Sequence, residues 1–265
     1  MKEYAVQKQL IPVDQNAGDP NWAKRQIWVY KLNSEDSVDD FDTLSEAQSK
    51  IDELDSNVSK ADAILLVVKP QDMGSVLEEI KGSINPEAVV ITFAAGKTIS
   101  FISNGLGTSN PVVRVMPNTP TLIGKGMAGY SLSSGVDSSQ KIFIEKLLAA
   151  TGKAIEIPEE LQNALTGTSG SGPAYFFRFV EAMVDGAVEM GLSREDATTL
   201  TIQTIVGAAA LLDGSEDSPA RLREKVTSLK GATAEALAVF DEAGISEIVA
   251  KAMAASARRA GELAQ

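Results

Sequence analysis

The sequence contains neither cysteine nor histidine among its 265 residues. Without cysteine there is no disulfide, no thiolate zinc site and no cysteine nucleophile. Without histidine, catalysis of the Ser-His-Asp type and imidazole metal ligands are excluded as well. Any chemistry must therefore come from hydroxyls, carboxylates, lysine, backbone groups or a bound cofactor, and no metal site is predicted.

Positive charge and long apolar runs are also scarce. The chain carries 24 Lys and Arg against 36 Asp and Glu, a net charge of −12. An acidic chain repels phosphate backbones, so nucleic acid is not an expected partner. No apolar run approaches the roughly 18 residues that span a bilayer, and the start, Met1-Lys2-Glu3-Tyr4, has no apolar signal core. These features predict a soluble, cytoplasmic protein with no membrane partner.

Short β-branched runs alternate with helical stretches between about residues 26 and 157. The run 63–68 is almost wholly apolar, as expected of a strand covered on both faces. Similar runs follow at 88–93 and 112–116, and the stretch 72–81 between the first two has apolar residues at helical spacing. Strands that alternate with helices predict a largely parallel sheet with crossover helices.

From about residue 159 the strand pattern ends and the sequence predicts helices. The segment 173–190 is apolar on most sides, so a stable helix there must be buried on most sides. A domain of about 100 residues seldom buries such a helix alone, so the segment predicts a partner subunit. The expected fold class is therefore α/β, with a Rossmann-like, largely parallel sheet domain over 1–157 and an all-α oligomerisation domain over 158–265.

Unusual residues follow three of the expected strands, at the end where a dinucleotide site of such a sheet lies. Val67-Val68-Lys69-Pro70-Gln71 turns out of the most apolar strand. Phe93-Ala94-Ala95-Gly96-Lys97 leaves the next with small residues, which let a ligand approach the backbone. Arg114-Val115-Met116-Pro117-Asn118-Thr119-Pro120 ends the third. Each segment alone is typical of an ordinary turn, but their occurrence at adjacent strand ends favours a ligand site.

The glycine-rich dinucleotide pattern occurs in the wrong place. Gly124-Lys125-Gly126-Met127-Ala128-Gly129 precedes Tyr130-Ser131-Leu132, which resembles a strand, whereas a true cofactor loop follows a strand and opens a helix. The expected position, after a first strand near residues 5–12, has no glycine until Gly18. Without such glycines the backbone cannot curl closely around a pyrophosphate, so residues 1–25 are an atypical start for a cofactor domain.

Two clusters of small and polar residues lie in the helical part. The first, Thr166-Gly167-Thr168-Ser169-Gly170-Ser171-Gly172-Pro173-Ala174-Tyr175, leads into the apolar helix, and a hinge or close helix packing would explain it equally well. The second, Val226-Thr227-Ser228-Leu229-Lys230-Gly231-Ala232-Thr233, precedes a predicted helix. The hydroxyls of Ser228 and Thr233, together with free N–H groups at the helix start, suit a carboxylate. A simple N-cap is the alternative interpretation.

Together these segments resemble the pyrroline-5-carboxylate reductase family. The likeness covers roughly residues 26–264, and Arg-Val-Met-Pro-Asn-Thr-Pro and Ser-Gly-Ser-Gly-Pro-Ala-Tyr are its most specific motifs. The resemblance implies a Rossmann domain and a helical domain that interlocks with that of a second subunit, in dimers that often build larger rings. It also implies reduction of 1-pyrroline-5-carboxylate to L-proline, the last step of proline biosynthesis, with NADPH or NADH as the cofactor.

The resemblance further implies which residues form the site. Thr233 would hold the ring nitrogen and share its proton while a hydride reaches the imine carbon, and Ser228 would support that loop, so both are catalytic candidates. The predicted substrate contacts are Glu159, Glu216, Ala232 and Thr233. The predicted cofactor contacts are Asn57, Val67, Val68, Lys69, Pro70, Phe93, Ala94 and Ala95.

Departures from the family pattern keep three hypotheses open. Besides the glycine-poor start, Leu229 and Lys230 stand where the family has proline and glycine. The chain is an active reductase, a non-enzymatic oligomeric relative that cannot hold NAD(P)H, or another Rossmann-plus-helical dehydrogenase, such as one acting on β-hydroxyacids. The choice between NADPH and NADH is also open, since Lys31 would suit a 2′-phosphate but equally a solvated surface.

Overall fold

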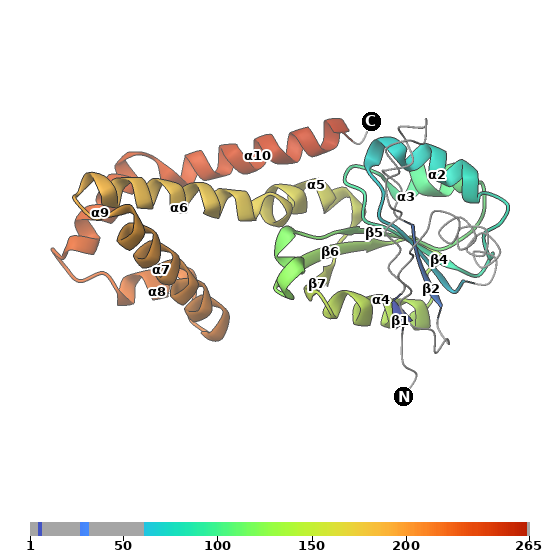
Figure 1. Ribbon diagram of the computed structural model, residues 1–265, viewed down its shortest axis with the longest axis horizontal. Coiled ribbons are helices and arrows are strands. Elements are labelled where there is room, and N and C mark those ends of the chain that lie inside the picture. The colour runs from blue at the N-terminus through green and yellow to red at the C-terminus, as the bar shows by residue number, and fades with distance from the viewer. Residues whose placement is uncertain (1–4, 7–26, 32–60, 264–265) are drawn as a thin grey trace. The chain divides into compact units, whose positions relative to one another are not determined.

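The structure is a computed structural model that describes residues 5–6, 27–31 and 61–263 (Figure 1). Asn57 and most of the glycine-poor start therefore lie outside the described residues. The chain divides into two compact units, Met1–Gly170 with Ser256–Gln265, and Ser171–Ala255. The predicted domain boundary after residue 157 stays a prediction.

The first unit is built on a sheet whose described strands follow one another in chain order. Strands β3, β4 and β5 are parallel, as are β6 and β7. The pairings β1–β2, β2–β3 and β5–β6 are antiparallel. The strands are β1 (Ala5–Val6), β2 (Ile27–Lys31), β3 (Ala63–Leu66), β4 (Val89–Thr92), β5 (Val112–Met116), β6 (Gly126–Leu132) and β7 (Gly152–Glu156).

Three helices link the parallel strands. Helix α2 (Met73–Ile80) joins β3 to β4, α3 (Ile99–Leu106) joins β4 to β5, and α4 (Ser138–Ala149) joins β6 to β7. Helices α2 and α3 cover one face of the sheet and α4 covers the other (Figure 1). Because β6 reverses the strand direction, a crossover of the same hand and the same lateral step must place its helix on the opposite face. The expected α/β class with crossover helices is confirmed.

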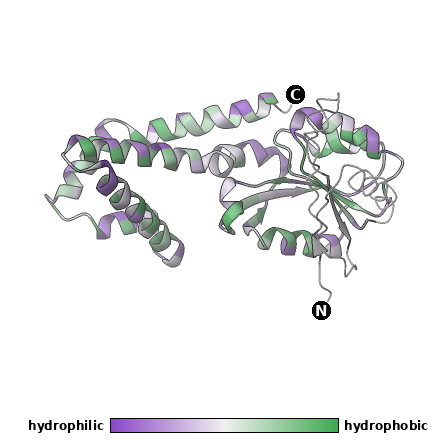
Figure 2. Ribbon diagram, viewed as in Figure 1, coloured by the Kyte–Doolittle hydropathy of each residue, from purple (hydrophilic) through white to green (hydrophobic). Residues whose placement is uncertain are grey.

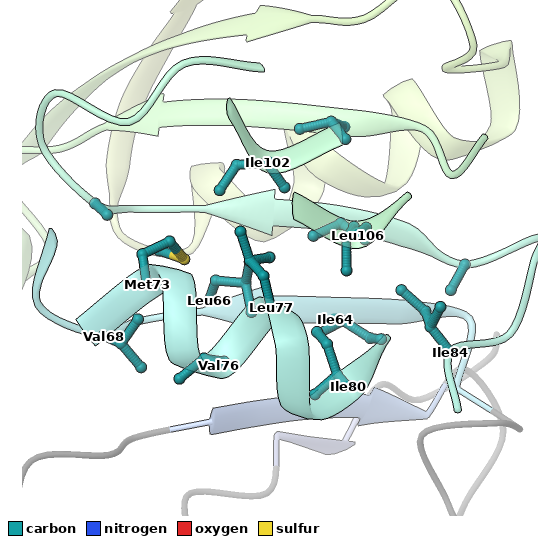
Figure 3. Close-up of a cluster of buried hydrophobic side chains, with 14 of the residues drawn as sticks. Ile64, Leu66, Val68, Met73, Val76, Leu77, Ile80, Ile84, Ile102 and Leu106 are labelled. Atoms are coloured by element: carbon teal, nitrogen blue, oxygen red, sulfur yellow. The ribbon is translucent and has the colours of Figure 1, made fainter. Parts of the chain in front are cut away.

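Apolar side chains fill the space on both faces of this sheet. On one face, Ile64 and Leu66 of β3 pack against Leu77 of α2 and Ile102 of α3 (Figure 3). On the other, Leu65 belongs to a second buried cluster. Side chains alternate along a strand, so the unbroken apolar run of β3 supplies both cores. Each such fully buried side chain contributes about 2 kcal/mol of transfer free energy.

Helix α3 is an element that the sequence pattern did not predict. Thr98 caps it, its Oγ1 accepting a hydrogen bond from the Phe101 N–H at 3.0 Å. Gly107 ends it with φ +64°, a left-handed conformation that glycine adopts without a Cβ clash. Ile102 and Leu106 place its apolar face in the core. These capping signals are present in the sequence, but the helix is short and lies between two loops rich in small residues.

The second unit is helical. Helices α6 and α7 pack against each other, and the rings of Phe179 and Phe240 lie 6.1 Å apart. The hydroxyls of Ser193 and Ser218 cap α7 and α8. The helices are α6 (Gly172–Glu189), α7 (Arg194–Gly214), α8 (Pro219–Lys225), α9 (Ala232–Glu242) and α10 (Ile245–Leu263), of which the residues from Ser256 on are assigned to the first unit.

Much apolar surface of this helical unit is exposed. Phe176 and Phe177 of α6 are 62% and 63% exposed, and Gly172 and Val184 are the buried residues of that helix. Figure 2 shows apolar residues recurring along α6 and α7. A single chain therefore does not supply the burial that the composition of α6 requires. Within the described ranges, none of the helices has the length and apolar character needed to cross a membrane.

Candidate active site

Two of the predicted cofactor loops leave the same edge of the sheet, because β3 and β4 are parallel neighbours. Leu66 pairs in register with Thr92, so the loops that begin at Val67 and Phe93 start side by side. Val67 is exposed, Val68 is buried and Lys69 is exposed. Pro70 then opens a short 3-10 turn that continues into α2. The loop thus presents an apolar side chain and a cation at the edge where a dinucleotide binds in such sheets.

The second loop is small and tightly held. Phe93 is half-buried, Ala94 is buried and Ala95 is exposed. The Ala94 N–H donates to Thr92 Oγ1 at 3.2 Å, and Gly96 has φ +77°, which favours glycine. Small side chains beside an apolar ring leave the backbone approachable. The loop therefore offers small residues and an apolar ring at this edge of the sheet, and the segment expected to hold the pyrophosphate lies outside the described residues.

The Arg-Val-Met-Pro-Asn-Thr-Pro motif ties the sheet to the segment 159–170. Arg114 of β5 is buried, and its Nη1 lies 3.2 Å from Oε1 of Glu159. The same carboxylate oxygen accepts a hydrogen bond from the backbone N–H of Ile99, the first residue of α3, at 2.8 Å. Asn118 donates from Nδ2 to the carbonyl oxygen of Ser169 at 3.2 Å. The two motifs most specific for the family are therefore joined directly, through Asn118 and Ser169.

The first half of the Ser-Gly-Ser-Gly cluster is explained by close packing. After α5 (Gln162–Leu165), residues 166–170 form a π-helical turn. A Cβ at Gly170 would lie 2.9 Å from Cε of Met116, and a Cβ at Gly129 would overlap the side chain of Leu165. Close packing against the Met116 side chain therefore accounts for Gly170, which ends the part of the cluster that belongs to the first unit.

The second polar cluster leads into α9. Gly231 is the N-cap of α9 and its N–H donates to the Ser228 carbonyl at 3.0 Å. Ala232 and Thr233 are the first two residues of the helix, and both are exposed. Their N–H groups have no acceptor within a helix and lie at its positive end, which suits an anion. Lys230 adopts φ +58°, a left-handed conformation that costs a side-chain-bearing residue about 1–2 kcal/mol.

The predicted site residues fall into both units. The described cofactor candidates and Glu159 belong to the first unit, and Ser228, Ala232 and Thr233 to the second. Glu216 is an exposed residue between α7 and α8. Sequence reasoning missed the role of Arg114 and its contact with Glu159. The available signal was a charged residue inside an apolar strand, which is seldom fully buried without a partner.

Comparison with known proteins decides the family. Residues 159–263 match the family described as pyrroline-5-carboxylate reductase dimerisation. The pyrroline-5-carboxylate reductase of Pseudomonas aeruginosa is 37% identical over 262 residues, which are 98% of this chain and 91% of the relative. The chain belongs to the pyrroline-5-carboxylate reductase family. That alignment extends through the glycine-poor start, which the sequence motifs alone did not relate to the family.

Further members of the pyrroline-5-carboxylate reductase family give the same result. The relative from Synechocystis is 38% identical over 208 residues, 78% of this chain and 76% of its own length. A solved pyrroline-5-carboxylate reductase from Coxiella burnetii has a TM-score of 0.77 at 34% identity, covering 85% of this chain and 86% of the other. A pyrroline carboxylate reductase from Plasmodium falciparum, solved with NADP bound, has a TM-score of 0.73 at 31% identity and 80% coverage of both chains. Membership excludes the hypothesis of a β-hydroxyacid dehydrogenase.

Proposed function

We propose that this chain is an NADPH- or NADH-dependent reductase that converts 1-pyrroline-5-carboxylate into L-proline. The observation that carries the proposal is the exposed Thr233 at the uncapped start of α9, in a chain of the pyrroline-5-carboxylate reductase family. The relative solved with NADP bound supports a nicotinamide dinucleotide as the cofactor. A cytoplasmic location is part of the proposal, because a cysteine-free chain needs no oxidising compartment.

The first unit would hold the cofactor. Reduced nicotinamide supplies the hydride when it is bound. The exposed Val67 and the half-buried Phe93 would keep water from the ring, and buried Val68 and Ala94 would fix the backbone on either side. Lys69 and Pro70 would contact the cofactor further along the same loop, with Ala95 beside it and Asn57 as a further contact.

The second unit would hold the imine. The N–H groups of Ala232 and Thr233, at the positive end of α9, would bind the substrate carboxylate. The Thr233 hydroxyl would orient the ring nitrogen and share the proton that it gains on reduction, while Ser228 would support the turn through its contact with Gly231. Glu216 is the acidic side chain of this unit that we place near the substrate. Orientation of two bound reactants is a large part of such catalysis, which explains how the chain acts without histidine.

We also propose that two copies form a homodimer through the helical unit. Phe176 and Phe177 leave apolar area on α6 that one chain does not cover. The match of residues 159–263 to a family described by its dimerisation supports this partner over an unrelated one. Assembly of dimers into a larger ring stays a prediction from the resemblance.

Cofactor titration tests the proposal against the non-enzymatic alternative. Purified protein is titrated with NADPH and, separately, with NADH while nicotinamide fluorescence is followed, and 1-pyrroline-5-carboxylate is then added. The proposal expects saturable binding and formation of proline. A folded oligomer that binds neither dinucleotide at millimolar concentration would instead support the non-enzymatic relative.

Substitution of Thr233 tests the catalytic assignment. Thr233→Ala removes the hydroxyl that orients the nitrogen and shares its proton, so we expect turnover to fall about 100-fold or more, the usual scale for a lost proton-transfer group. Thr233→Ser keeps the hydroxyl and is expected to retain most of the turnover. Both variants should remain dimeric by light scattering. Equal turnover in wild type and Thr233→Ala would remove Thr233 from the mechanism.

A further inference from the structure

The carboxylate of Glu159 lies where the cofactor loop ends. Its Oε1 accepts a hydrogen bond from the Ile99 N–H at 2.8 Å and lies 3.2 Å from Arg114 Nη1. Ile99 is the first residue of α3, so its N–H is one of the groups that a helix cannot satisfy internally. A carboxylate from a segment 60 residues further along the chain satisfies it. The charge also suits the positive end of the helix.

This contact anchors one end of the loop that follows β4. At the other end of the loop, the Phe93 N–H donates to the Leu66 carbonyl of β3 at 3.1 Å. The predicted cofactor contacts Phe93, Ala94 and Ala95 lie between these two anchors. Because only a few residues separate the anchors, displacement of Ile99 moves the loop backbone.

The segment that carries Glu159 is itself rigidly held against the sheet. Ser131 of β6 donates its hydroxyl to the Ile157 carbonyl at 2.8 Å, and Nε2 of the buried Gln162 donates to Ser131 Oγ at 2.9 Å. Arg114 of β5, whose side chain is 8% exposed, holds the Glu159 carboxylate through an ion pair. The carboxylate therefore has little freedom to move. A group that positions another one accurately must itself be held in this way.

We propose that Glu159 is a positioning residue for the nicotinamide cofactor: held by Arg114, it fixes the start of α3 and thereby the loop 93–98. The inference rests on the proposed function and replaces the substrate contact that the resemblance implies for Glu159, because Glu159 then acts on the cofactor loop and does not contact the imine. Arg114 is the residue that aims the carboxylate and neutralises it.

The test compares three substitutions of Glu159 that separate the effect of side-chain length, or reach, from the effect of charge. Glu159→Gln keeps an acceptor oxygen at the same distance but loses the charge, whereas Glu159→Asp keeps the charge and shortens the side chain by one methylene. Glu159→Ala loses both. Nicotinamide fluorescence measures the Kd for NADPH, steady-state kinetics the KM for the imine substrate, and thermal unfolding the Tm, all on the full-length oligomer.

We expect the Kd for NADPH to rise about tenfold in Glu159→Ala, the effect of losing one well-placed hydrogen bond to a charged group. Glu159→Gln should stay within about threefold of wild type and Glu159→Asp should lie between them. The Tm should fall in Glu159→Gln, because Arg114 loses its counter-charge. The KM for the imine substrate should change little in all three. If Glu159→Ala fails to fold, the order of the NADPH Kd values of Glu159→Gln and Glu159→Asp still tests the inference.

Glu156→Gln is the matched control. Glu156 lies three residues upstream and pairs with Lys141 of α4, on the helix of the opposite sheet face. Its substitution removes an ion pair of the same domain and should leave the Kd for NADPH unchanged. A change in Kd there equal to that of Glu159→Ala would overturn the inference, since any lost ion pair would then suffice.

Four other results would overturn it as well. A raised KM for the imine substrate with an unchanged Kd for NADPH would return Glu159 to the substrate. A smaller Kd change in Glu159→Asp than in Glu159→Gln would show that charge matters more than reach. Wild-type protein that binds no NADPH would overturn the proposed function together with this inference, whereas active wild type with an unaltered Glu159→Ala would overturn the inference alone.

Discussion

The two units of this chain differ in where they bury their apolar residues. In the α/β unit, side chains such as Ile64 and Leu66 are 0% exposed, and both faces of the sheet are covered by helices of the same chain. In the helical unit, Phe177 and Leu211 are 63% and 64% exposed. The described sheet core of the first unit is therefore buried within the chain, whereas the second unit has an apolar surface whose burial requires another chain.

This contrast places the proposed cofactor loops and the proposed dimer interface in different units. The loops at Val67 and Phe93 lie in the first unit, whose stability is expected to be independent of protein concentration. Stability of the helical unit, and with it the substrate loop at Ser228, is expected to depend on association. Substitutions in the core of the first unit should therefore lower the free energy of unfolding, whereas substitutions on the apolar surface of the second should weaken association.

The largest effect is expected from paired charges on α6. Replacing Phe176 and Phe177 together by Glu places two carboxylates in the proposed interface, where they would be desolvated without partners. We expect dimer affinity to fall by more than about a hundredfold, since large interface side chains are each worth about 2 kcal/mol or more. Sedimentation velocity across a concentration series measures it. Ile142→Glu, on an apolar residue 51% exposed on α4, is the control that should stay dimeric.

This prediction is decisive for the comparison of the units. If the double variant stays dimeric at micromolar concentration, the exposed face of α6 is not the interface. The contrast between a self-sufficient and a dependent unit would then lose its main support.

A large effect of another kind is expected from Leu66→Ala. Leu66 of β3 is fully buried in the cluster that β3 forms with α2. The substitution leaves a cavity and should lower the free energy of unfolding by roughly 3 kcal/mol. Urea unfolding followed by circular dichroism measures the loss, and sedimentation should show an unchanged dimer affinity. Val67→Ala, one residue further on at a side chain 37% exposed, should cost much less. A Leu66→Ala variant that dissociates instead would show that the two units are not independent.

A smaller effect is expected from Tyr130→Phe in the α/β unit. The Tyr130 hydroxyl donates to Glu145 Oε1 at 2.9 Å, and burial together with this carboxylate raises the pKa of Tyr130 far above its ordinary value. At neutral pH the variant should be about 1 kcal/mol less stable. Above about pH 10 the unfolded tyrosine loses its proton while the folded one keeps it, so wild type loses stability there and the difference vanishes near pH 11. Chemical denaturation at several pH values measures this difference, and a constant gap from pH 7 to 11 would contradict the burial argument.

The smallest effect is expected at Lys230 of the helical unit. Among the described residues of the α/β unit, positive φ angles occur at glycines, whereas the helical unit places Lys230 at φ +58°. Lys230→Gly should raise stability by roughly 0.5 kcal/mol, the relief of strain less the greater entropy of unfolded glycine. Leu229→Gly, outside this region, should lower it. Thermal unfolding at fixed protein concentration compares the two, and a destabilised Lys230→Gly would indicate that the side chain forms a favourable contact.

Local patterns in the sequence predicted most elements correctly. The strand at 112–116 and the helix within 72–81 were recognisable from an apolar run and from apolar residues at helical spacing. Rejection of Gly124–Gly129 as the cofactor loop is supported, because Gly126 and Gly129 lie within β6. Helix α3 was missed because Ser100, Ser103, Asn104 and Gly105, four of its eight residues, are poor helix formers. Site residues from Val67 to Thr233 were predicted from a resemblance, and they remain predictions.

Residue types and their spacing were enough to exclude whole classes of chemistry, to locate most helices and strands, and to show that the helix at 173–190 needs more burial than one chain offers. These properties are local or additive, so they can be read from residue types and spacing. Tertiary structure alone decided that Glu159 meets Ile99 and Arg114, which are 60 and 45 residues away. Such a contact depends on strand order and on the face that each crossover covers, and many sequences of the same pattern could place that carboxylate elsewhere.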